Sequence, residues 1–514
     1  MSTYDTPARG PGILLVLDGW GQAPPAADNA LAAARTPALD ALWAEYPGTL
    51  AEASGEVVGL LPGTVGNSEI GHMVIGAGRP LPYDSLLVQQ AIDSGALRIH
   101  EHLSALCARL AAEDRALHLI GLCSDGQIHA HVDHLGELLA VAAAHAVPRV
   151  WIHAITDGRD VADGTGEAYL QRVAGIARDA GTGRIATVIG RGYAMDKAGN
   201  LQSTEVAVRL VADAVGEPVQ TAEHAVRASQ RGDEWVEPSV VTDRTGAPSA
   251  TIGAGDALLW FNFRSDRIQQ FADRLLEHLH TTGRPVRSTS LTQYDTRTSI
   301  PALIGRADAS GGLADELAAA GLRSVRIAEA EKFEHVTYYI NGRDNTRRDV
   351  EEHIRITGPQ PPDYRSRPQM NLDQVTDAVL AAAARPEVDL VIANLANIDV
   401  VGHTGDYDAT VKACEHTDEA VERIADAARR AGRWVLLVGD HGNAEQMTKT
   451  APDGTVRPYG GHTTNPVPLV VVPAPGQSVP AALDDGATLA DVAPTVLRLL
   501  GHKPGGAMTG SPLL

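Results

Sequence analysis

The sequence predicts an α/β fold in which the strands of mainly parallel sheets alternate with helices. Short apolar runs at residues 13–17, 117–122 and 150–155 are bounded by Gly and polar residues, as strands buried in a parallel sheet are. Ala-rich stretches with helical character, such as residues 101–112 and 136–145, lie between such runs. Alternation of strand and helix is typical of α/β proteins.

Four further apolar runs follow at residues 185–189, 257–261, 390–393 and 434–438, and a helical stretch spans residues 418–431. Reactive or polar side chains (Asp, His, Arg, Asn or Ser) follow these runs. In parallel sheets, binding sites form just beyond the carboxyl ends of the strands. The pattern therefore predicts a functional site built from strand ends.

The size and charge of the chain limit its organisation and its partners. With 514 residues it is too long for one hydrophobic core, so we expect two or more domains. Its 43 Lys and Arg against 64 Asp and Glu give a formal net charge of −21. This balance argues against nucleic acid or an anionic membrane as a partner, because both need a basic face.

Cysteine usage and the absence of long apolar runs indicate a cytoplasmic protein, for which we expect a monomer. Cys107, Cys123 and Cys414 form no CxxC pair, so we expect reduced, mostly buried thiols. Residues 1–12 are polar and rich in Pro and Gly, unlike a signal peptide. No apolar run approaches the ~18 residues of a membrane span.

The polar clusters differ in chemistry along the chain, which predicts a domain division. Clusters between about residues 115 and 270 are rich in Arg, whereas those near the two chain ends are rich in Asp and His. We therefore predict a discontinuous metal-binding domain of residues 1–80 and 309–514, with a substrate-binding domain of residues 81–308 inserted into it.

Three Asp and three His residues at strand ends or Gly-rich turns are candidate metal ligands. They are Asp18, Asp399, His403, Asp440, His441 and His462. Asp399 and His403 are four residues apart, so on a helix both side chains face the same way. A single such residue is more often an ordinary turn residue, but six together indicate metal binding. Mixed carboxylate and imidazole ligation suits Mn²⁺ or Zn²⁺.

Ser68 is the candidate nucleophile, and a second interpretation of it is equally compatible with the pattern. A serine between glycines ahead of an apolar stretch can simply be a helix N-cap. The functional interpretation rests on charge, because a hydroxyl beside a divalent cation loses its proton readily. In addition, backbone N–H groups at a helix start can hold a transferred phosphate.

Several basic residues are candidates for binding an anionic substrate. They are Arg159, Arg191, Arg264, Arg267 and Lys332. Guanidinium groups suit bidentate binding of carboxylate and phosphate. One Arg after a strand is usually a surface ion pair, but several in so acidic a protein indicate a binding site. Asp160 could accept hydrogen bonds from substrate hydroxyls or cap the following helix, and the sequence leaves both roles open.

Ten motifs taken together resemble the cofactor-independent phosphoglycerate mutases of the alkaline phosphatase superfamily, over roughly residues 12–500. The motifs span residues 15–21, 66–72, 124–131, 157–160, 193–196, 262–267, 327–332, 399–403, 439–443 and 462–466. The resemblance implies a phosphatase-like metal domain with an inserted α/β phosphotransferase domain. It also implies a glycolytic isomerase that interconverts 3-phosphoglycerate and 2-phosphoglycerate through a phosphoserine, with two Mn²⁺ ions and without 2,3-bisphosphoglycerate.

The resemblance also implies a role for each matching residue. One metal would be held by Asp399, His403 and His462. The other would be held by Asp18, Ser68, Asp440 and His441. The small phosphorylated carboxylate substrate would be contacted by His129, Arg159, Asp160, Arg191, Lys197, Arg264, Arg267 and Lys332.

The departures from the family pattern lie on the substrate side. Lys197 stands where the family usually has Arg, the Arg-Trp pair that commonly follows is missing, and Gly192 replaces a Tyr. Every metal position matches. A specialised mutase or phosphatase for a related phospho- or phosphono-carboxylate is therefore an open alternative, and a non-catalytic homologue is a third.

Overall fold

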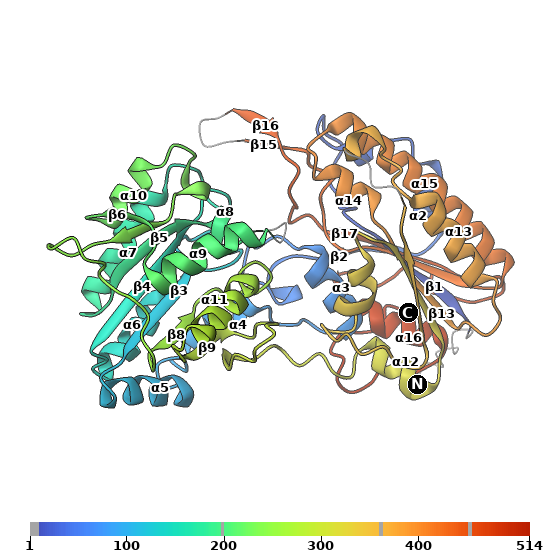
Figure 1. Ribbon diagram of the computed structural model, residues 1–514. Helices are drawn as coiled ribbons and strands as arrows, with labels where there is room; N and C mark the ends of the chain where they lie inside the picture. The colour runs from blue at the N-terminus through green and yellow to red at the C-terminus, as the bar shows by residue number, and fades with distance from the viewer. Residues whose placement is uncertain (1–9, 197–199, 359–362, 451–454) are drawn as a thin grey trace. The chain divides into compact units, whose positions relative to one another are not determined.

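The chain forms two compact units, each an eight-stranded sheet with helices on both faces (Figure 1). The computed structural model describes residues 10–196, 200–358, 363–450 and 455–514. Unit 1 consists of the chain up to Tyr83 and of Asp308–Leu514, and unit 2 consists of Asp84–Ala307. The predicted α/β class is confirmed.

The sheet of unit 1 has the strand order β12-β11-β13-β1-β14-β17-β2-β18. Strands from β12 to β14 pair in parallel, whereas β17 is antiparallel to both β14 and β2. β15 and β16 form a separate antiparallel pair. The strands are β1 (Gly12–Leu17), β2 (Gly48–Glu52), β11 (Ser324–Glu329), β12 (Glu351–Ile356), β13 (Leu390–Leu395), β14 (Trp434–Gly439), β15 (Thr448–Thr450), β16 (Val456–Pro458), β17 (Val467–Val472) and β18 (Ala487–Thr488).

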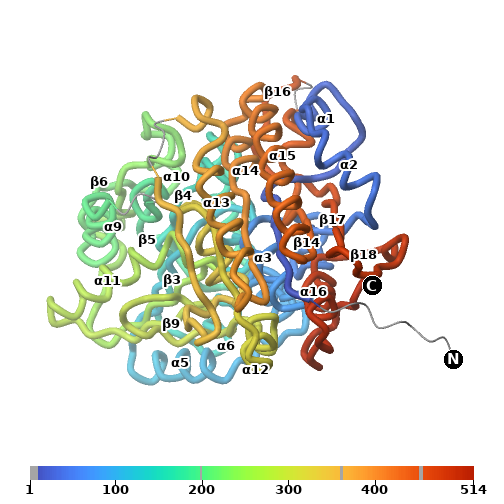
Figure 2. The backbone as a smooth tube through the Cα atoms, turned by 90° about the vertical axis from the view of Figure 1, so that its right-hand side faces the viewer, coloured from blue at the N-terminus to red at the C-terminus, as the bar shows by residue number. Residues whose placement is uncertain are grey.

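Helices cover both faces of this sheet, and β1 is buried between them. The helical elements are α1 (Ala30–Ala33), α2 (Pro37–Glu45), η1 (Gly55–Val58), α3 (Ser68–Ala77), α12 (Leu313–Ala320), η3 (His335–Tyr339), η4 (Tyr364–Ser366), α13 (Leu372–Ala383), α14 (Asn397–Gly402), α15 (Tyr407–Arg430), η5 (Leu489–Asp491) and α16 (Val492–Leu500). Leu14 and Val16 of β1 pack in a cluster with α3 and α16, while Leu15 and Leu17 pack with α13 and α15. Figure 2 shows α13 and α15 side by side.

The sheet of unit 2 has the strand order β10-β9-β8-β3-β4-β5-β7-β6, and its pairs are parallel except for β5 with β7. The strands are β3 (Ala116–Leu122), β4 (Arg149–Thr156), β5 (Arg184–Gly190), β6 (Glu217–Val219), β7 (Ser239–Val241), β8 (Ala257–Trp260), β9 (Arg287–Thr292) and β10 (Ala302–Ile304). The helical elements are α4 (Asp84–Asp93), α5 (Glu101–Ala112), α6 (His134–Ala144), α7 (Gly166–Asp179), α8 (Arg191–Ala194), α9 (Leu201–Asp213), α10 (Ala222–Ala228), η2 (Asp233–Trp235) and α11 (Gln269–Thr281).

All seven predicted strands are present, and the predicted helices at residues 101–112 and 136–145 correspond to α5 and α6. The stretch at residues 418–431 is only the second half of α15. That helix starts at Tyr407 because the side chain of Asp406 caps it by accepting a hydrogen bond from the backbone N–H of Ala409. This polar helix start lies outside the apolar pattern on which the prediction depended.

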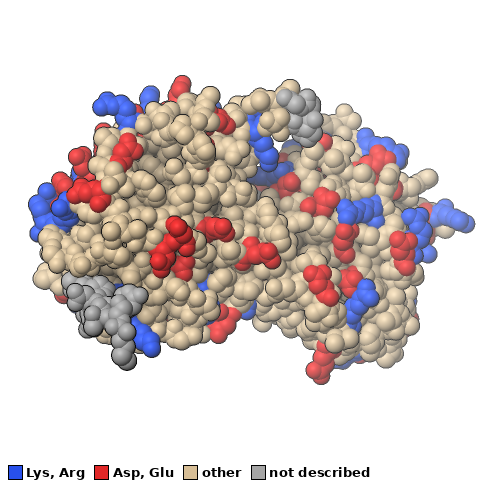
Figure 3. Space-filling model, turned by 180° about the vertical axis from the view of Figure 1, so that it is seen from behind, with Lys and Arg blue, Asp and Glu red and all other residues tan. Residues whose placement is uncertain are grey.

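The composition led to expectations for the cysteines, the apolar segments and the surface charge. The three cysteines are free and buried, as predicted. Among the helices in the described ranges, none is both long and apolar enough to cross a membrane. Figure 3 shows Asp and Glu side chains scattered among Lys and Arg on one face.

Phe271 of α11 offers a test of how much helix packing contributes to the stability of unit 2. It is fully buried, and its ring meets that of Trp260 edge-on with centroids 5.4 Å apart. Phe271→Ala leaves a cavity that its neighbours fill only in part, so we expect the free energy of unfolding of unit 2 to fall by about 3–5 kcal/mol. Amide hydrogen exchange in unit 2, compared with unit 1 in the same sample, measures this change. Ile99→Ala is the control because Ile99 is 82% exposed, and equal losses in the two variants would contradict the prediction.

Candidate metal centre and anion-binding cavity

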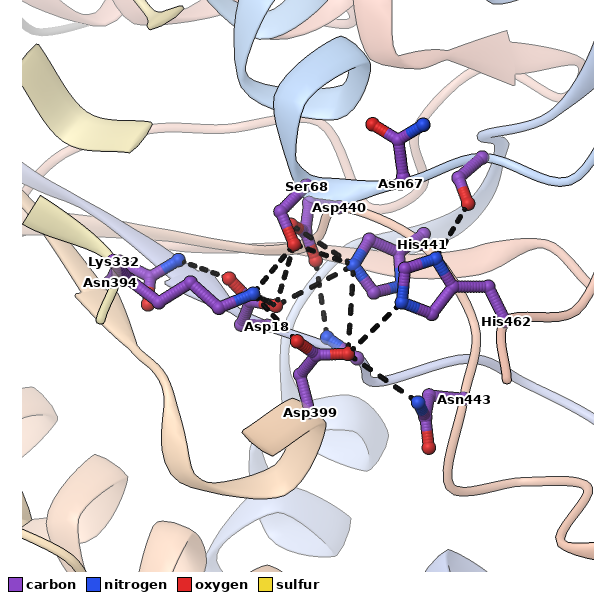
Figure 4. Close-up of polar contacts among 12 residues, drawn as sticks. Asp18, Asn67, Ser68, Lys332, Asn394, Asp399, Asp440, His441, Asn443 and His462 are labelled. Atoms are coloured by element: carbon purple, nitrogen blue, oxygen red, sulfur yellow. Dashed lines mark hydrogen bonds and ion pairs between the residues drawn. The ribbon is translucent and has the colours of Figure 1, made fainter. Parts of the chain in front are cut away.

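The carboxylates of the candidate metal centre follow three neighbouring strands of unit 1. Asp18 comes directly after β1, Asp440 directly after β14, and Asp399 lies in α14 just after β13. Because β1 pairs in parallel with both β13 and β14, the carboxyl ends of these strands meet at one edge of the sheet. Figure 4 shows the three side chains pointing toward one another.

Two groups of carboxylate and imidazole side chains have possible ligand atoms within 4.8 Å of one another. The groups are Asp18, Asp440 and His441, and Asp399, His441 and His462. His403 adjoins the second group, with its Nε2 3.3 Å from Asp399 Oδ1 and 3.2 Å from His462 Nε2. The fold thus brings together all six Asp and His residues that the sequence singled out.

Ser68 is the first residue of α3, and its hydroxyl faces the carboxylates and imidazoles. Its Oγ lies 2.9 Å from His441 Nε2 and 3.2 Å from Asp18 Oδ1. The N-cap of α3 is Asn67, whose side chain accepts a hydrogen bond from the backbone N–H of Ile70. The interpretation of Ser68 as a helix cap is therefore wrong, and its hydroxyl is directed into the cluster.

Close packing of α3 against the end of β14 sets the position of Ser68. A Cβ atom at Gly71 would lie 2.7 Å from the backbone oxygen of Asp440, so the approach requires glycine. One turn of helix joins Ser68 to His72, whose Nδ1 lies 2.8 Å from the Ser68 carbonyl oxygen. The close contact between Gly71 and Asp440, which brings α3 to the carboxylates, therefore also positions Ser68.

Two asparagines that were given no role in the sequence analysis hold the carboxylates in place. Asn394 donates from Nδ2 to Asp18 Oδ2 at 2.6 Å, and Asn443 donates from Nδ2 to Asp399 Oδ1 at 3.4 Å. Both asparagines belong to strand ends that carry other site residues, and that placement was the available signal. Their partners, which lie far away in the sequence, could not be read from it.

Lys332 belongs to unit 1, where its ammonium lies in the carboxylate cluster. Its Nζ is 2.7 Å from Asp18 Oδ1, 2.6 Å from Asp399 Oδ2 and 2.6 Å from Ser68 Oγ. Burial favours the neutral amine, but the surrounding carboxylates outweigh burial and hold the pKa of Lys332 above its usual value. Lys332 is therefore a buried cation that offsets part of the carboxylate charge.

The donor set of this cluster fits divalent cations. Three buried carboxylates carry more negative charge than Lys332 alone can offset. Asp440 Oδ2 is buried and accepts no hydrogen bond from the described residues. Burial would lower the pKa of His441, but the carboxylates around it raise that pKa to about 9, so the cluster attracts positive charge. Oxygen and imidazole donors of this kind suit Mn²⁺ and Zn²⁺.

In unit 2, a cavity of about 200 Å³ lies at the carboxyl ends of the neighbouring strands β8, β3, β4 and β5. It is lined by His129, Arg159, Asp160, Arg191, Gly192, Met195, Asp196, Glu234, Trp235 and Arg267. Arg264 lies beside this set, since Arg264 and Arg267 both pair with Asp266, at 3.1 and 3.2 Å. Six of the predicted substrate-binding residues therefore gather in unit 2, whereas Lys197 lies outside the described residues.

The cavity combines buried ion pairs with a neutral imidazole. Arg191 Nη1 lies 2.6 Å from both Asp157 Oδ1 and Asp160 Oδ2. The next helix, α7, has Thr165 as its N-cap, so the idea that Asp160 caps it is wrong. Burial and the charges of the neighbouring arginines hold the pKa of His129 well below its usual value. The cavity thus brings arginines, carboxylates and an uncharged imidazole close together.

The fold and the two carboxylate–imidazole groups define this protein as a metalloenzyme, and the family model described as "Metalloenzyme superfamily" matches residues 10–504. A 2,3-bisphosphoglycerate-independent phosphoglycerate mutase of Streptomyces coelicolor is 72% identical over 514 residues, which is 100% of each chain. One of a Synechococcus species is 39% identical, covering 99% of this chain and 97% of that one. A crystal structure of Leishmania mexicana phosphoglycerate mutase at low cobalt concentration superimposes with a TM-score of 0.80 at 28% identity, covering 99% of this chain and 98% of that chain. The chain therefore belongs to the 2,3-bisphosphoglycerate-independent phosphoglycerate mutase family, as the motifs indicated.

Glu329, three residues before Lys332, gives a test of the buried charge in unit 1. Burial raises its pKa from 4.5 to about 7. Between these values the folded chain keeps a proton that the unfolded chain loses, so the stability that this group contributes is complete below pH 4.5 and is lost as the pH rises through 7. Glu329→Gln should therefore raise the free energy of unfolding of unit 1 by about 1 kcal/mol at pH 5.5 and about 3 kcal/mol at pH 8.5. Urea unfolding at both pH values measures this, and a gain that does not grow with pH would contradict it.

Proposed function

We propose that this protein interconverts 3-phosphoglycerate and 2-phosphoglycerate through a phosphoserine at Ser68. The observation that carries the proposal is the placement of the Ser68 hydroxyl, which contacts Asp18, His441 and the Lys332 ammonium at the start of α3. The relatives described above carry the mutase name, which favours phosphoglycerate over a related analogue as substrate. The complete set of matching metal positions, together with Ser68, argues against a non-catalytic homologue.

Ser68 would accept and return the phosphoryl group. Its Oγ would form a bond to phosphorus as the bond between phosphorus and the 3-oxygen of glycerate breaks; the serine loses a proton and the glycerate oxygen gains one. In the return step, the 2-oxygen of glycerate would form a bond to phosphorus as the bond between phosphorus and Oγ breaks; the 2-hydroxyl loses a proton and the serine gains one. Lys332 would stabilise negative charge on Oγ by a charge-assisted hydrogen bond. The amino end of α3 favours the negative charge of a phosphoserine.

The metal ligands would divide between two divalent cations, which we propose to be Mn²⁺. One set is Asp399, His403 and His462. The other set is Asp18, Ser68, Asp440 and His441. When bound, the cations would lower the pKa of the serine hydroxyl and offset charge on the phosphoryl oxygens. The oxygen-rich character of the ligands, with imidazoles added, supports Mn²⁺.

Unit 2 would bind the substrate through its arginines. Guanidinium groups of Arg159, Arg191, Arg264 and Arg267 suit both the carboxylate and the phosphate of phosphoglycerate. His129 and Asp160 would hydrogen-bond to the remaining oxygens, and we retain Lys197 and Lys332 as proposed substrate contacts. We further propose that the protein acts as a cytoplasmic monomer without added 2,3-bisphosphoglycerate.

Replacing the proposed nucleophile tests the reaction. Ser68→Ala should reduce isomerisation by more than about 10⁴-fold, because no acceptor for the phosphoryl group remains. Phosphorus NMR of the protein with Mn²⁺ and 3-phosphoglycerate measures 2-phosphoglycerate formation, and mass spectrometry of acid-quenched protein detects the phosphoserine. Ser104→Ala, on α5 of unit 2, is the control and should retain both signals. Release of inorganic phosphate as fast as isomer formation would count against a mutase.

Removing the metal tests the proposed ligands. Dialysis against a chelator should abolish isomerisation, and Mn²⁺ should restore it. Titration calorimetry should find about two Mn²⁺ per wild-type chain and about one tight site in His462→Ala, because that variant loses an imidazole from one ligand set only. His416→Ala serves as the control, since His416 lies on the surface of α15 with a side chain 40% exposed. Full activity after complete metal removal would refute this assignment.

A further inference from the structure

Glu234 brings a carboxylate into the wall of the cavity that is rich in arginine. Its Oε1 lies 3.5 Å from Nη1 of Arg159, and both residues line the cavity together with Arg191 and Arg267. The side chains of Arg159 and Glu234 are 56% and 31% exposed, whereas that of Arg191 is only 6% exposed. The Arg159–Glu234 ion pair is therefore longer and more exposed to solvent than the ion pairs of Arg191.

The backbone that carries Glu234 is held firmly in unit 2. The buried carboxylate of Asp233 accepts a hydrogen bond from the backbone N–H of Gly166 at 2.8 Å, and its carbonyl oxygen accepts one from Thr156 Oγ1 at 2.7 Å. On the other side of Glu234, the ring of Trp235 is fixed as well. The Glu234 carboxylate can thus leave Arg159 by rotation of its own side chain, without movement of η2.

The Trp235 ring also explains the glycine that departs from the family pattern. A Cβ atom at Gly192 would lie 2.7 Å from this ring, so the indole occupies the space of a side chain there. Tyr193 meets the ring edge-on with centroids 5.4 Å apart, and the guanidinium of Arg231 lies 4.5 Å from its centroid. These contacts fix the Trp235 ring beside Glu234 in the cavity wall.

We propose that Glu234 is a positioning residue that acts as an exchangeable counter-ion for Arg159. It holds the guanidinium at the cavity while no anion is bound and yields it to a carboxylate or phosphate of the substrate, so the inference rests on the proposed function. The carboxylate competes with the substrate for the same N–H donors, which weakens binding and speeds product release. Arg191, gripped by two carboxylates, keeps its partners throughout.

The test measures binding of 3-phosphoglycerate to the Mn²⁺-loaded protein by calorimetry, together with steady-state kinetics. Glu234→Gln should tighten binding by about two- to fivefold, the range that a partly exposed ion pair supports, and should lower KM and kcat together. Glu234→Ala should act in the same direction. The effect should disappear when Arg159→Ala is combined with Glu234→Gln.

Glu167→Gln is the matched control. Glu167 lies on α7, is not part of the cavity lining, and pairs with Arg227 at 2.8 Å. The substitution removes the same charge and should leave KM and kcat unchanged. Unchanged or weaker binding in both Glu234 variants, with the fold retained by circular dichroism, would overturn the proposal, as would a raised KM with a reduced kcat/KM. A different outcome would separate the two proposals. If the wild-type protein bound 3-phosphoglycerate without isomerising it, and Glu234→Gln bound it more tightly, the proposed function would be rejected and the counter-ion role would stand.

Discussion

The structure of unit 1 depends on how the mutual repulsion of three buried carboxylates is offset. The parallel pairing of β13, β1 and β14 forces Asp18, Asp399 and Asp440 to one edge of the sheet. Like charges buried this close raise the free energy of the fold unless cations offset them. Lys332 offsets part of the charge, and the carboxylates also raise the pKa of His441. The remaining negative charge is the property that suits the cluster to divalent cations. The same excess of carboxylate charge therefore affects both the stability of unit 1 and its binding of metal ions.

The cavity of unit 2 places arginines and carboxylates side by side. Arg191 is neutralised by two buried carboxylates, and this arrangement keeps its guanidinium fixed in orientation. Arg159 meets Glu234 in a more solvent-exposed ion pair, the kind that contributes little to stability. The cavity thus combines a tightly held arginine with a more exposed one. Both units thus hold charged side chains together with counter-charges built into the fold.

Seven continuous apolar runs predicted strands correctly, whereas strands without such a run were missed. β1 and β14 are apolar along nearly their whole length, whereas β11 contains Arg326, which is buried beside Glu351 of β12 at 3.4 Å. β2 alternates between buried and exposed residues. A buried ion pair or a half-exposed strand breaks the apolar run, so these strands gave no signal, although they complete the sheet.

The sequence by itself determined the family, the α/β class and the six Asp and His residues of the metal centre. Those features are local, because each motif places its side chain at the end of a strand or helix or in a Gly-rich turn. Tertiary structure alone decided that Asn67 caps α3 and frees Ser68, that Lys332 joins the carboxylates, and that Glu234 faces Arg159. These outcomes depend on distances between segments that are remote along the chain or on the direction of one side chain. Neither is encoded in spacing, because only packing settles which charges become neighbours.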